Sequence, residues 1–309
     1  MDVENIDISL LEEIEAHAIY CAREAGQILL EHFSKPLEVQ FKGKERTDPV
    51  TTADRRSEEF LESAIREKFP QHGILSEEGG PLYKSDSPFV WVLDPLDGTC
   101  NFMNGLPLFA VSIGVLWNWQ PVVGSIYVPV SHRATAGVYH ACLGKGAYLN
   151  GEKIEVVREP SGRPLSGNPF QFGRRCRLSG QSQREPQEAR NLGSIALELA
   201  MAASGVFQYA FFGSPKVWDV AAGILLVKEA GGLAFSRQSR GRNWLPLERF
   251  QTEQGNDQEA LGSLRSWSSP VVAGAPDITL KVVQDVRSHH APISWLTALH
   301  RHRGQKDGK

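Results

Sequence analysis

The sequence is poor in cysteine, and the cysteines it has do not cluster. The four stand far apart and form no CxxC pair: Cys21, Cys100, Cys142 and Cys176. This spacing excludes the common zinc motifs and gives no disulfide framework. We therefore expect free thiols, as in a reducing cytoplasm, and a small buried side chain at Cys100.

Long apolar runs and long basic runs are also missing. The longest apolar stretches, such as PVVGSIYVPV, are far shorter than the roughly 20 residues that cross a bilayer. The acidic, amphipathic start MDVENIDISL lacks the basic beginning and apolar middle of a secretory signal. A formal net charge of −3 without a basic run argues against a nucleic-acid partner. We predict a cytoplasmic protein with no membrane segment and no nucleic-acid partner.

What the sequence does contain is amphipathic helices followed by β-rich runs. Apolar residues spaced three and four apart predict helices over 8–33 and 53–69. Short β-rich runs separated by Gly, Pro and Asn predict a sheet between 89 and 139. The polar segment 158–191 is predicted to be mainly loop, with short strands possible. After it, GSIALELAMAASG predicts a helix, GVFQYAFF a strand, and WDVAAGILLVKEAGG an apolar helix that ends at paired glycines.

The chain length bears on domain organisation. A chain of 309 residues, 41% of them hydrophobic, can bury a substantial core in one large domain or two coupled lobes. We predict an N-terminal α+β lobe over 1–150 that carries the metal-binding motifs. A C-terminal α/β lobe over 151–287 completes the active site, and residues 288–309 form a solvated tail.

Acidic residues beside turns and element ends are the most informative feature. They lie in four separated segments: Asp48 and Asp54 in DPVTTAD, Glu77 and Glu78 in LSEEGG, Asp94 and Asp97 in WVLDPLDGTCNF, and Asp219 in WDVAAG. We expect the chain to leave the sheet at Asp94, because Pro95 favours a turn and Gly98 permits unusual backbone angles. Asp94 and Asp97 can then converge on one cation, with the Leu96 carbonyl as a third oxygen. Oxygen ligands without histidine indicate Mg²⁺ and not zinc.

Each segment also has a simpler interpretation. DPLDGT alone is compatible with an acidic turn, since Asp, Pro and Gly are common turn formers. LSEEGG alone is compatible with a solvated loop. Asp219 is compatible with a helix cap, which does not exclude a metal role. An EF-hand is excluded, because the acids do not recur at alternate positions and no Glu closes a twelve-residue loop.

Taken together, the four segments resemble the inositol monophosphatase family, and they occur in the family's order. LSEEGG is similar to its Glu-Glu turn, and DPVTTAD to its Asp-x-Val-Thr-x-x-Asp element. WVLDPLDGTCNF and WDVAAGILLVKEAGG are similar to its two signatures. The resemblance implies a mixed α/β chain folded as a layered αβαβα sandwich of the sugar-phosphatase type. It also implies a magnesium-dependent, lithium-sensitive phosphatase, usually a homodimer, and leaves the tail after about residue 285 unexplained.

The resemblance implies metal ligands by motif match. Glu77, Asp94 and the Leu96 carbonyl would hold one Mg²⁺. Asp94, Asp97 and Asp219 would hold a second. Some family members bind a third, weaker ion near Glu77. The cofactor prediction is therefore two or three Mg²⁺ per subunit.

Catalytic and phosphate-binding residues follow from the same match. Asp54 would accept a hydrogen bond from Thr99, so that the pair draws a proton from water on the first metal, beside Glu77. The backbone at Gly98 and Thr99, at the start of a predicted helix, would bind the phosphate together with Gly193. Because the metals activate water, no covalent intermediate is needed.

One departure from the family pattern bears on the substrate. In inositol-specific members, an acidic residue seven positions before the second-signature Asp binds ring hydroxyls. Here that position is Phe212, which cannot accept those hydrogen bonds. Lys216, and more weakly Arg174, Arg175 and Arg177, are candidates to meet a second negative charge. The alternative is that Phe212 only packs in a strand and that the arginines form a solvated face.

The prediction from sequence is a Mg²⁺-dependent phosphomonoesterase that hydrolyses a small phosphorylated metabolite by attack of metal-activated water. One alternative is a bisphosphate phosphatase of the same fold, acting on fructose 1,6-bisphosphate or a nucleotide 3′-phosphate. The other is a non-catalytic regulatory protein that keeps the fold. Six intact positions argue against the regulatory alternative: Asp54, Glu77, Asp94, Asp97, Thr99 and Asp219.

Overall fold

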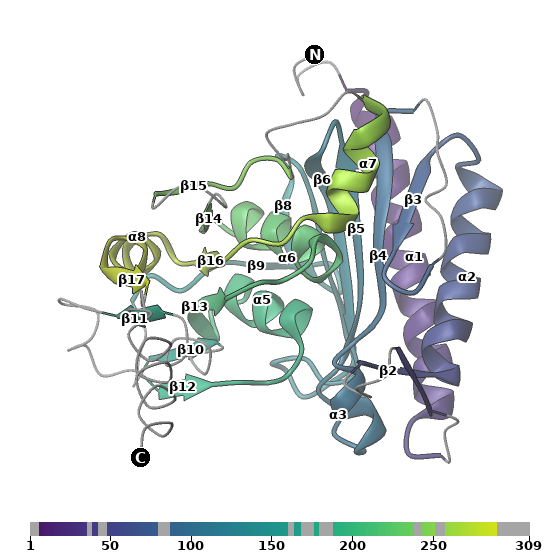
Figure 1. Cartoon of the computed structure of the whole chain (residues 1–309), viewed down its shortest axis with the longest axis horizontal. Helices are drawn as coiled ribbons and strands as arrows, with labels where there is room; N and C mark the ends of the chain where they lie inside the picture. Colours follow the sequence, from purple (N-terminus) through teal and green to yellow (C-terminus); the bar gives the residue numbers. More distant parts are fainter. Residues whose placement is uncertain are drawn as a thin grey trace, which may run out of the picture.

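Helices and sheets alternate in five layers in this computed structural model (Figure 1). The structure describes residues 6–35, 39–42, 48–79, 87–159, 164–167, 176–178, 188–237, 243–250 and 257–288. From one side to the other, the layers are α1 (Ile8–His32) and α2 (Thr52–Lys68), a seven-stranded sheet, α5 (Ile195–Ala203) and α6 (Val217–Glu229), a six-stranded sheet, and α8 (Pro276–Asp285). This order confirms the αβαβα fold class predicted from the sequence.

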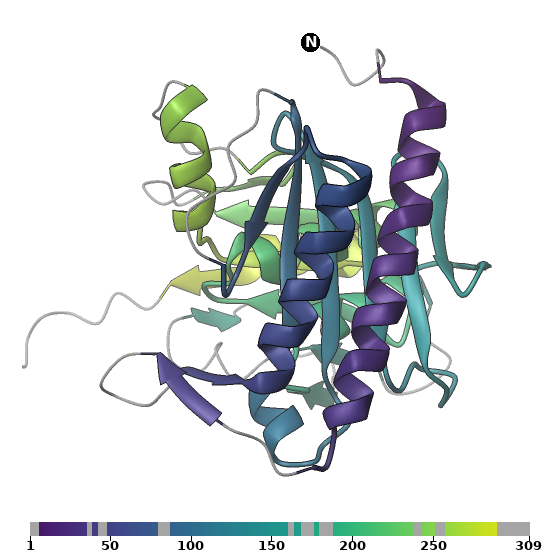
Figure 2. The ribbon, with the colours of Figure 1, turned by 90° about the vertical axis from the view of Figure 1, so that its right-hand side faces the viewer.

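Helices α1 and α2 lie side by side over one face of the seven-stranded sheet (Figure 2). Their apolar stripes face the sheet, and Ile14, Leu29 and Leu61 are fully buried. Asp7 caps α1, because its side chain accepts the Ser9 N–H at 2.9 Å. Both helices begin and end within one residue of the predicted spans.

The first sheet is longer in sequence than predicted. Its strands follow one another in space as they do in the chain: β3 (Gly73–Ser76), β4 (Phe89–Asp97), β5 (Ala110–Trp117), β6 (Gln120–Val128), β7 (Gly137–Cys142), β8 (Gly146–Leu149) and β9 (Glu152–Ile154). Only β3 and β4 pair in parallel. Because helices cover both faces, the central strands are buried along almost their whole length. The lobe boundary at residue 150 stays a prediction.

Strand β4 does not end at Asp94, so the turn expected there is wrong. The strand continues to Asp97 through an irregularity. Asp94 lies opposite Ser112 and Asp97 opposite Ala110, which leaves two residues of β4 facing one of β5. Such a bulge fits the sequence, because Pro95 has no N–H to donate to the ladder. The chain leaves the sheet only at Gly98, whose φ is 90°, and enters the short helix α3 (Thr99–Met103).

The second sheet is built from the later part of the chain. Its strands, in spatial order, are β12 (Glu188–Arg190), β10 (Leu165–Gly167), β13 (Phe207–Phe212), β16 (Val271–Gly274), β14 (Leu233–Arg237) and β15 (Trp244–Pro246). The predicted helices of α5 and α6 and the predicted strand of β13 are confirmed. The polar segment 158–191 contributes short strands, as the sequence allowed.

Two small strand pairs and one more helix complete the described elements. The pairs are β1 (Val39–Lys42) with β2 (Asp48–Thr51), and β11 (Cys176–Leu178) with β17 (Val286–Ser288). The helix is α7 (Asp257–Ser266). No helix among the described residues is long and apolar enough to cross a membrane. The predicted tail lies outside the described residues from 289 onward.

Helix α6 lies very close to the first sheet because two glycines face it. A Cβ at Gly124 would lie 2.7 Å from the carbonyl oxygen of Ala222. A Cβ at Gly114 would lie 2.7 Å from the Cβ of Ala221. Side chains at these positions would therefore push α6 away from β5 and β6. The close packing sets where the first turn of α6, which carries Asp219, stands above the sheet.

Candidate active site

Strand pairing places Glu77 beside Asp94. Ser76 at the end of β3 pairs with Leu93 of β4, and the next N–H, that of Glu77, donates to the Leu93 carbonyl at 3.0 Å. The residues that follow each member of this parallel pair meet at the same edge of the sheet. The Glu-Glu turn and the first signature, separate in sequence, are therefore neighbours.

Asp97 is held by the start of α5. Its Oδ2 accepts two hydrogen bonds of 2.6 Å, from the Ser194 hydroxyl and from the Ala196 N–H. Ser194 is also the N-cap of α5. Burial raises the pKa of Asp97, although the hydrogen bonds from Ser194 and Ala196 lower it. The Asp97 carboxylate thus links the bulge of β4 to the helix layer between the sheets.

Asp219 sits in the first turn of α6 and is tied to the same region. Its Oδ2 accepts the Lys216 N–H at 2.7 Å, which is the capping role that the sequence allowed. The Ser112 hydroxyl donates to the Trp218 carbonyl at 3.2 Å, and Ser112 pairs with Asp94 across β4 and β5. The start of α6 is therefore anchored next to Asp94.

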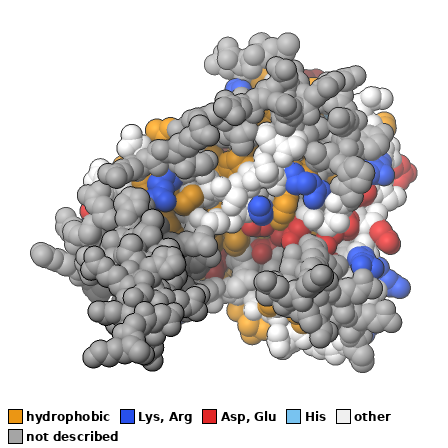
Figure 3. Space-filling model, in the orientation of Figure 1, with side chains coloured by type: hydrophobic (Ala, Val, Ile, Leu, Met, Phe, Trp, Pro, Cys, Tyr) orange, Lys and Arg blue, Asp and Glu red, His pale blue; other side chains and the backbone are white. Residues whose placement is uncertain are grey.

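Asp94 lies at the electrostatic centre of these acids and is only 2% exposed. Burial raises its pKa well above the ordinary value, and the negative charges of Glu77, Asp97 and Asp219 raise it further. Burial, then Asp97, likewise raises the pKa of Asp219 well above its usual range. Acidic side chains gather in a hollow in the middle of one face of the molecule (Figure 3). Such a concentration of buried negative charge favours binding of a cation.

The donor set fits a hard divalent cation, but the side chains are not arranged as a closed cage. Where the structure describes the chain, no three of the His, Cys, Asp and Glu side chains form a group that could hold a metal ion as they stand. Asp94 Oδ1 accepts the Leu96 N–H at 3.1 Å. The hydrogen bonds described above for Asp97 and Asp219 are accepted by Oδ2. Carboxylate and carbonyl oxygens without histidine are the ligands that suit Mg²⁺.

In this structure Thr99 and Asp54 have other hydrogen-bond partners than the predicted ones, and the predicted link between them stays a prediction. Asp54 Oδ2 accepts from the N–H and the hydroxyl of Thr51, at 2.9 and 2.5 Å. The Thr99 hydroxyl donates to the Leu96 carbonyl at 3.0 Å. Thr51 and Asp54 form the capping box of α2, so each has a local partner that competes with Thr99. Burial raises the pKa of Asp54 to about 6, against the effect of the Thr51 hydrogen bonds.

The predicted phosphate-binding glycines belong to two turns that meet. Gly98 and Gly193 have φ of 90° and 75°, where a side chain would be strained. The Asn101 amide donates to the Leu192 carbonyl at 2.6 Å, which joins the turn after β4 to the turn before α5. A Cβ at Gly98 would lie 3.2 Å from the Ser194 Cβ. The structure therefore brings Gly98 and Gly193 to one place beside Asp97.

Phe212 is a buried strand residue. It ends β13, is 1% exposed and packs in the larger hydrophobic core, as the alternative interpretation of this position predicts. Contact of its ring with a substrate has no support in the structure. Lys216 is half-buried at the N-cap of α6, and its positive charge lowers the pKa of Asp219. The ammonium group thus acts on the site electrostatically.

Several predicted residues fall outside what the structure describes. Arg174 and Arg175 are not among the described residues. Arg177 belongs to β11 and Asp48 to β2, but their side chains are not described. Their roles stay predictions.

The expectation of a buried Cys100 is wrong, since this cysteine is exposed. It lies on the short helix α3, which buries Phe102 against Phe33 and Phe109. One helical turn cannot bury both faces here, so Cys100 faces outward.

Comparison with known proteins agrees with this arrangement. The profile of the inositol monophosphatase family matches residues 10–266, a span that includes the four acidic segments. The chain belongs to the inositol monophosphatase family. This confirms the family that the motifs predicted.

Relatives and solved structures of the family cover most of the chain. A "Nus factor SuhB" from Pasteurella multocida is 37% identical over 223 residues, 70% of this chain and 82% of the relative. A "Fructose-1,6-bisphosphatase/inositol-1-monophosphatase" from Aquifex aeolicus is 34% identical over 220 residues, 69% of this chain and 81% of the relative. The structure of an inositol monophosphatase from Anabaena superposes with a TM-score of 0.65 at 28% identity, covering 89% of this chain and 95% of that one.

Sequence reasoning missed several residues that hold the site of this family member together. Ser57 donates to the Pro95 carbonyl at 3.0 Å, and Glu198 accepts the Leu192 N–H at 2.7 Å. The N-cap role of Ser194 had a signal, a serine directly before an apolar helical run. The capping box of Thr51 and Asp54 also had a signal in the sequence, the spacing T-x-x-D. Nothing local marks Ser57, because its partner is 38 residues away.

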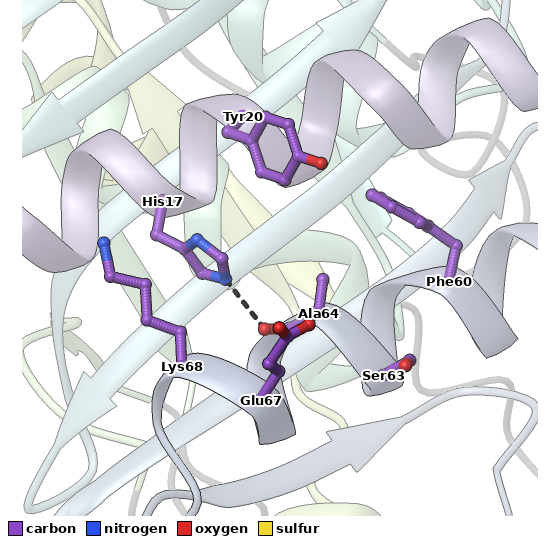
Figure 4. Close-up of a pocket in the computed structure, with 7 residues that line it drawn as sticks. All are labelled: His17, Tyr20, Phe60, Ser63, Ala64, Glu67 and Lys68. Atoms are coloured by element: carbon purple, nitrogen blue, oxygen red, sulfur yellow. Dashed lines mark hydrogen bonds between the residues drawn. The ribbon is translucent and has the colours of Figure 1, made fainter.

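A separate cavity of about 490 Å³ lies between α1 and α2, away from the acidic hollow (Figure 4). Its lining is mixed: His17, Tyr20, Phe60, Ser63, Ala64, Glu67 and Lys68. His17 Nε2 is 3.1 Å from the Ala64 carbonyl. The cavity belongs to the helix layer on one face of the seven-stranded sheet, whereas α6 and Asp219 lie on the other. It holds none of the predicted site residues.

Proposed function

We propose that this member of the inositol monophosphatase family is a Mg²⁺-dependent phosphomonoesterase that hydrolyses a small phosphorylated metabolite. The observation that carries the proposal is Asp94, buried and surrounded by the charges of Glu77, Asp97 and Asp219. Buried acids that raise one another's pKa in this way favour binding of a metal cation among them. Family membership agrees with the predicted enzyme class, a phosphoric monoester hydrolase.

The metal ligands are those that the motifs predicted. Glu77, Asp94 and the Leu96 carbonyl would hold one Mg²⁺, and Asp94, Asp97 and Asp219 a second. Bound Mg²⁺ supplies charge stabilisation at the phosphoryl group and makes a bound water more acidic. The number of ions, two or three, is part of the proposal.

Asp54 is the proposed proton acceptor. Burial raises its pKa to about 6, near the working range of a general base at neutral pH. The Thr99 hydroxyl would link Asp54 to the water only after leaving the Leu96 carbonyl, its present acceptor. If that carbonyl becomes a metal ligand, its bond to Thr99 weakens, which favours this change. The backbone of Gly98, Thr99 and Gly193 is proposed to bind phosphate oxygens.

Lys216 is the proposed determinant of substrate charge. Because its ammonium acts on Asp219, it stands where a second negative group of the substrate could meet it. This observation favours the alternative of a bisphosphate or another acidic phosphoester. The Aquifex relative, whose name includes both fructose-1,6-bisphosphatase and inositol-1-monophosphatase activities, supports keeping both substrate classes.

The regulatory alternative has support in the relatives named Nus factor SuhB. The intact acidic set argues for catalysis, and the two roles are compatible in one protein. A homodimer, a cytoplasmic location and the division into lobes near residue 150 remain proposals as well.

The function is tested by release of inorganic phosphate from a panel of metabolites, with Mg²⁺ and with a chelator. The panel comprises inositol 1-phosphate, fructose 1,6-bisphosphate, adenosine 3′,5′-bisphosphate and histidinol phosphate. We expect Mg²⁺-dependent release from at least one of them. Lys216→Ala should lower kcat/KM for bisphosphates about tenfold, more than for monoesters, with exposed Lys153→Ala as the control. Release from none of these in Mg²⁺ would favour the regulatory alternative.

A further inference from the structure

Arg265, in the last turn of α7, reaches across to the Glu-Glu turn. Its Nη2 donates to the carbonyl oxygens of Ser76 and Gly79, at 3.0 and 2.9 Å. These two carbonyls flank Glu77 and Glu78 on either side. One guanidinium therefore fixes both ends of the turn that carries a proposed metal ligand.

The same guanidinium also contacts the second signature. Its Cζ lies 6.0 Å from the ring centroid of Trp218, the residue before Asp219. Three residues further on, Ser268 pairs through its backbone with Lys216, the N-cap of α6. The segment from Arg265 to Ser268 thus spans from the Glu77 turn to the Asp219 turn.

Core residues on both sides of Arg265 hold it in place. Leu264 is 1% exposed and Trp267 6% exposed. The Trp267 ring packs edge-on against Phe250, with centroids 4.8 Å apart. Because these buried neighbours fix the backbone at Arg265, its hydrogen bonds limit the movement of the Glu77 turn relative to the core.

We propose that Arg265 is a positioning residue that keeps Glu77 in register with Asp94 and Asp219 and so raises the affinity of the acidic site for Mg²⁺. This rests on the proposed function, in which these acids bind Mg²⁺. A ligand turn held in place before the metal arrives loses less conformational freedom on binding. The Nη2 group donates to both carbonyls of the turn from within a rigid, planar guanidinium, whereas a lysine ammonium rotates freely on a flexible stem and orients its hydrogens less well.

The test is calorimetric titration of Mg²⁺ into the metal-free, full-length chain, as wild type, Arg265→Gln, Arg265→Lys and Arg133→Gln. We expect Arg265→Gln to weaken Mg²⁺ binding about tenfold or more, and Arg265→Lys to lie between it and wild type. At saturating Mg²⁺, kcat of the variants should return to within about twofold of wild type, because the ligands themselves are unchanged. Arg133, an exposed arginine paired with Glu152, serves as the matched control and should bind Mg²⁺ like wild type.

Folded Arg265 variants with wild-type Mg²⁺ affinity and only a lower Tm would overturn the proposal, since Arg265 would then be merely structural. If Arg265→Gln does not fold, the test rests on Arg265→Lys. Wild-type Mg²⁺ affinity in Arg265→Lys would then count against the proposal. A wild type that binds no Mg²⁺ would instead overturn the proposed function, and this inference with it.

Discussion

At the scale of single residues, Asp94 shows how burial and function oppose each other. The carboxylate is nearly inaccessible, and three further acids raise its pKa. Without a cation, this cluster lowers stability, because buried like charges repel. A bound cation neutralises this repulsion, and the relief adds to the affinity of the cluster for the cation. The residue that contributes most to Mg²⁺ binding should therefore be one that destabilises the metal-free protein.

Asp94→Asn should consequently have opposite effects on stability in the two states. In chelator, we expect the variant to be more stable than wild type by about 1–3 kcal/mol at pH 8, because a buried charge is removed. In excess Mg²⁺ the order should reverse, and kcat/KM should fall by more than about 100-fold. Thermal unfolding of wild type and variant, with and without Mg²⁺, measures this reversal in the order of stability. Exposed Asp277→Asn is the control and should show neither effect.

Glu198 is a second buried acid, and its environment differs from that of Asp94. It lies on the apolar helix α5, is 1% exposed and accepts the Leu192 N–H on Oε1. Its Oε2 is buried and has no hydrogen-bond partner in the part of the chain that the structure describes. Burial is the main cause that raises its pKa from 4.5 to about 8. Burial thus favours the protonated form of Glu198 in the folded protein near neutral pH.

This shift predicts a pH dependence of stability with a defined sign. Between pH 4.5 and about 8 the folded state holds a proton on Glu198 that the unfolded state has lost, so stability falls as pH rises through this window. Each pH unit costs roughly 1.4 kcal/mol at most. Glu198→Gln cannot ionise and should lose this part of the slope, so that its advantage over wild type grows from pH 5 to pH 8. Urea unfolding in chelator at both pH values measures it, with exposed Glu12→Gln as the control.

Parallel slopes for wild type and Glu198→Gln would contradict the shifted pKa. Metal-site acids also titrate in metal-free protein, but they are the same in both proteins. The difference between the two slopes therefore reports Glu198 together with its electrostatic coupling to Asp97.

Individual residue roles could be predicted only in part. The acids of the site are recognisable from sequence by their motifs, and the structure brings Glu77, Asp94, Asp97 and Asp219 within electrostatic reach. Their hydrogen-bond partners were less predictable. Asp54 takes the nearby Thr51, because a capping box satisfies N–H groups at the start of α2 at almost no cost in chain entropy.

At the scale of elements, the position of α6 on the first sheet decides where Asp219 stands. Gly124 permits the close approach, since a Cβ there would lie 2.7 Å from the backbone oxygen of Ala222. Backbone atoms cannot move aside as a flexible side chain can. A methyl group at this position must therefore displace the helix or the strand.

Gly124→Ala should destabilise the protein by about 1–3 kcal/mol, as overpacking usually does. By moving α6 it should also weaken Mg²⁺ binding, although Gly124 contacts no proposed ligand. Gly262→Ala is the matched control. A Cβ there meets nothing within 4 Å, and alanine favours the helix α7, so this variant should be neutral or slightly stabilised. Denaturant unfolding and Mg²⁺ titration of both variants check the expectation. Equal stability of the two would contradict the close-packing argument.

Element boundaries were predictable where hydrophobic periodicity was long. Helices α1 and α2 begin and end within one residue of expectation, because their apolar stripes extend over several turns. The end of β4 was not predictable, since an Asp-Pro pair after an apolar run signals a turn as well as a bulge. The pairing partner on β5 decides between them, and it lies in another part of the sequence.

At the scale of the whole molecule, the site is assembled from segments that only the fold brings together. Glu77 follows β3, Asp97 is bound by the start of α5, and Asp219 opens α6 between the two sheets. No periodicity in the sequence shows that these segments meet. The family resemblance supplied that information, whereas Arg265, which no motif includes, became evident only from the structure.

The central claim is that this cluster of acids binds Mg²⁺ and that the bound metal drives phosphate hydrolysis. The most direct measurement follows Mg²⁺ binding by calorimetry and phosphate release from the best panel substrate over one series of Mg²⁺ concentrations, starting from metal-free protein. We predict no release without metal, and release that rises over the concentrations at which Mg²⁺ binds. Undiminished phosphate release in chelator, or Mg²⁺ binding with no release from any substrate, would contradict the account.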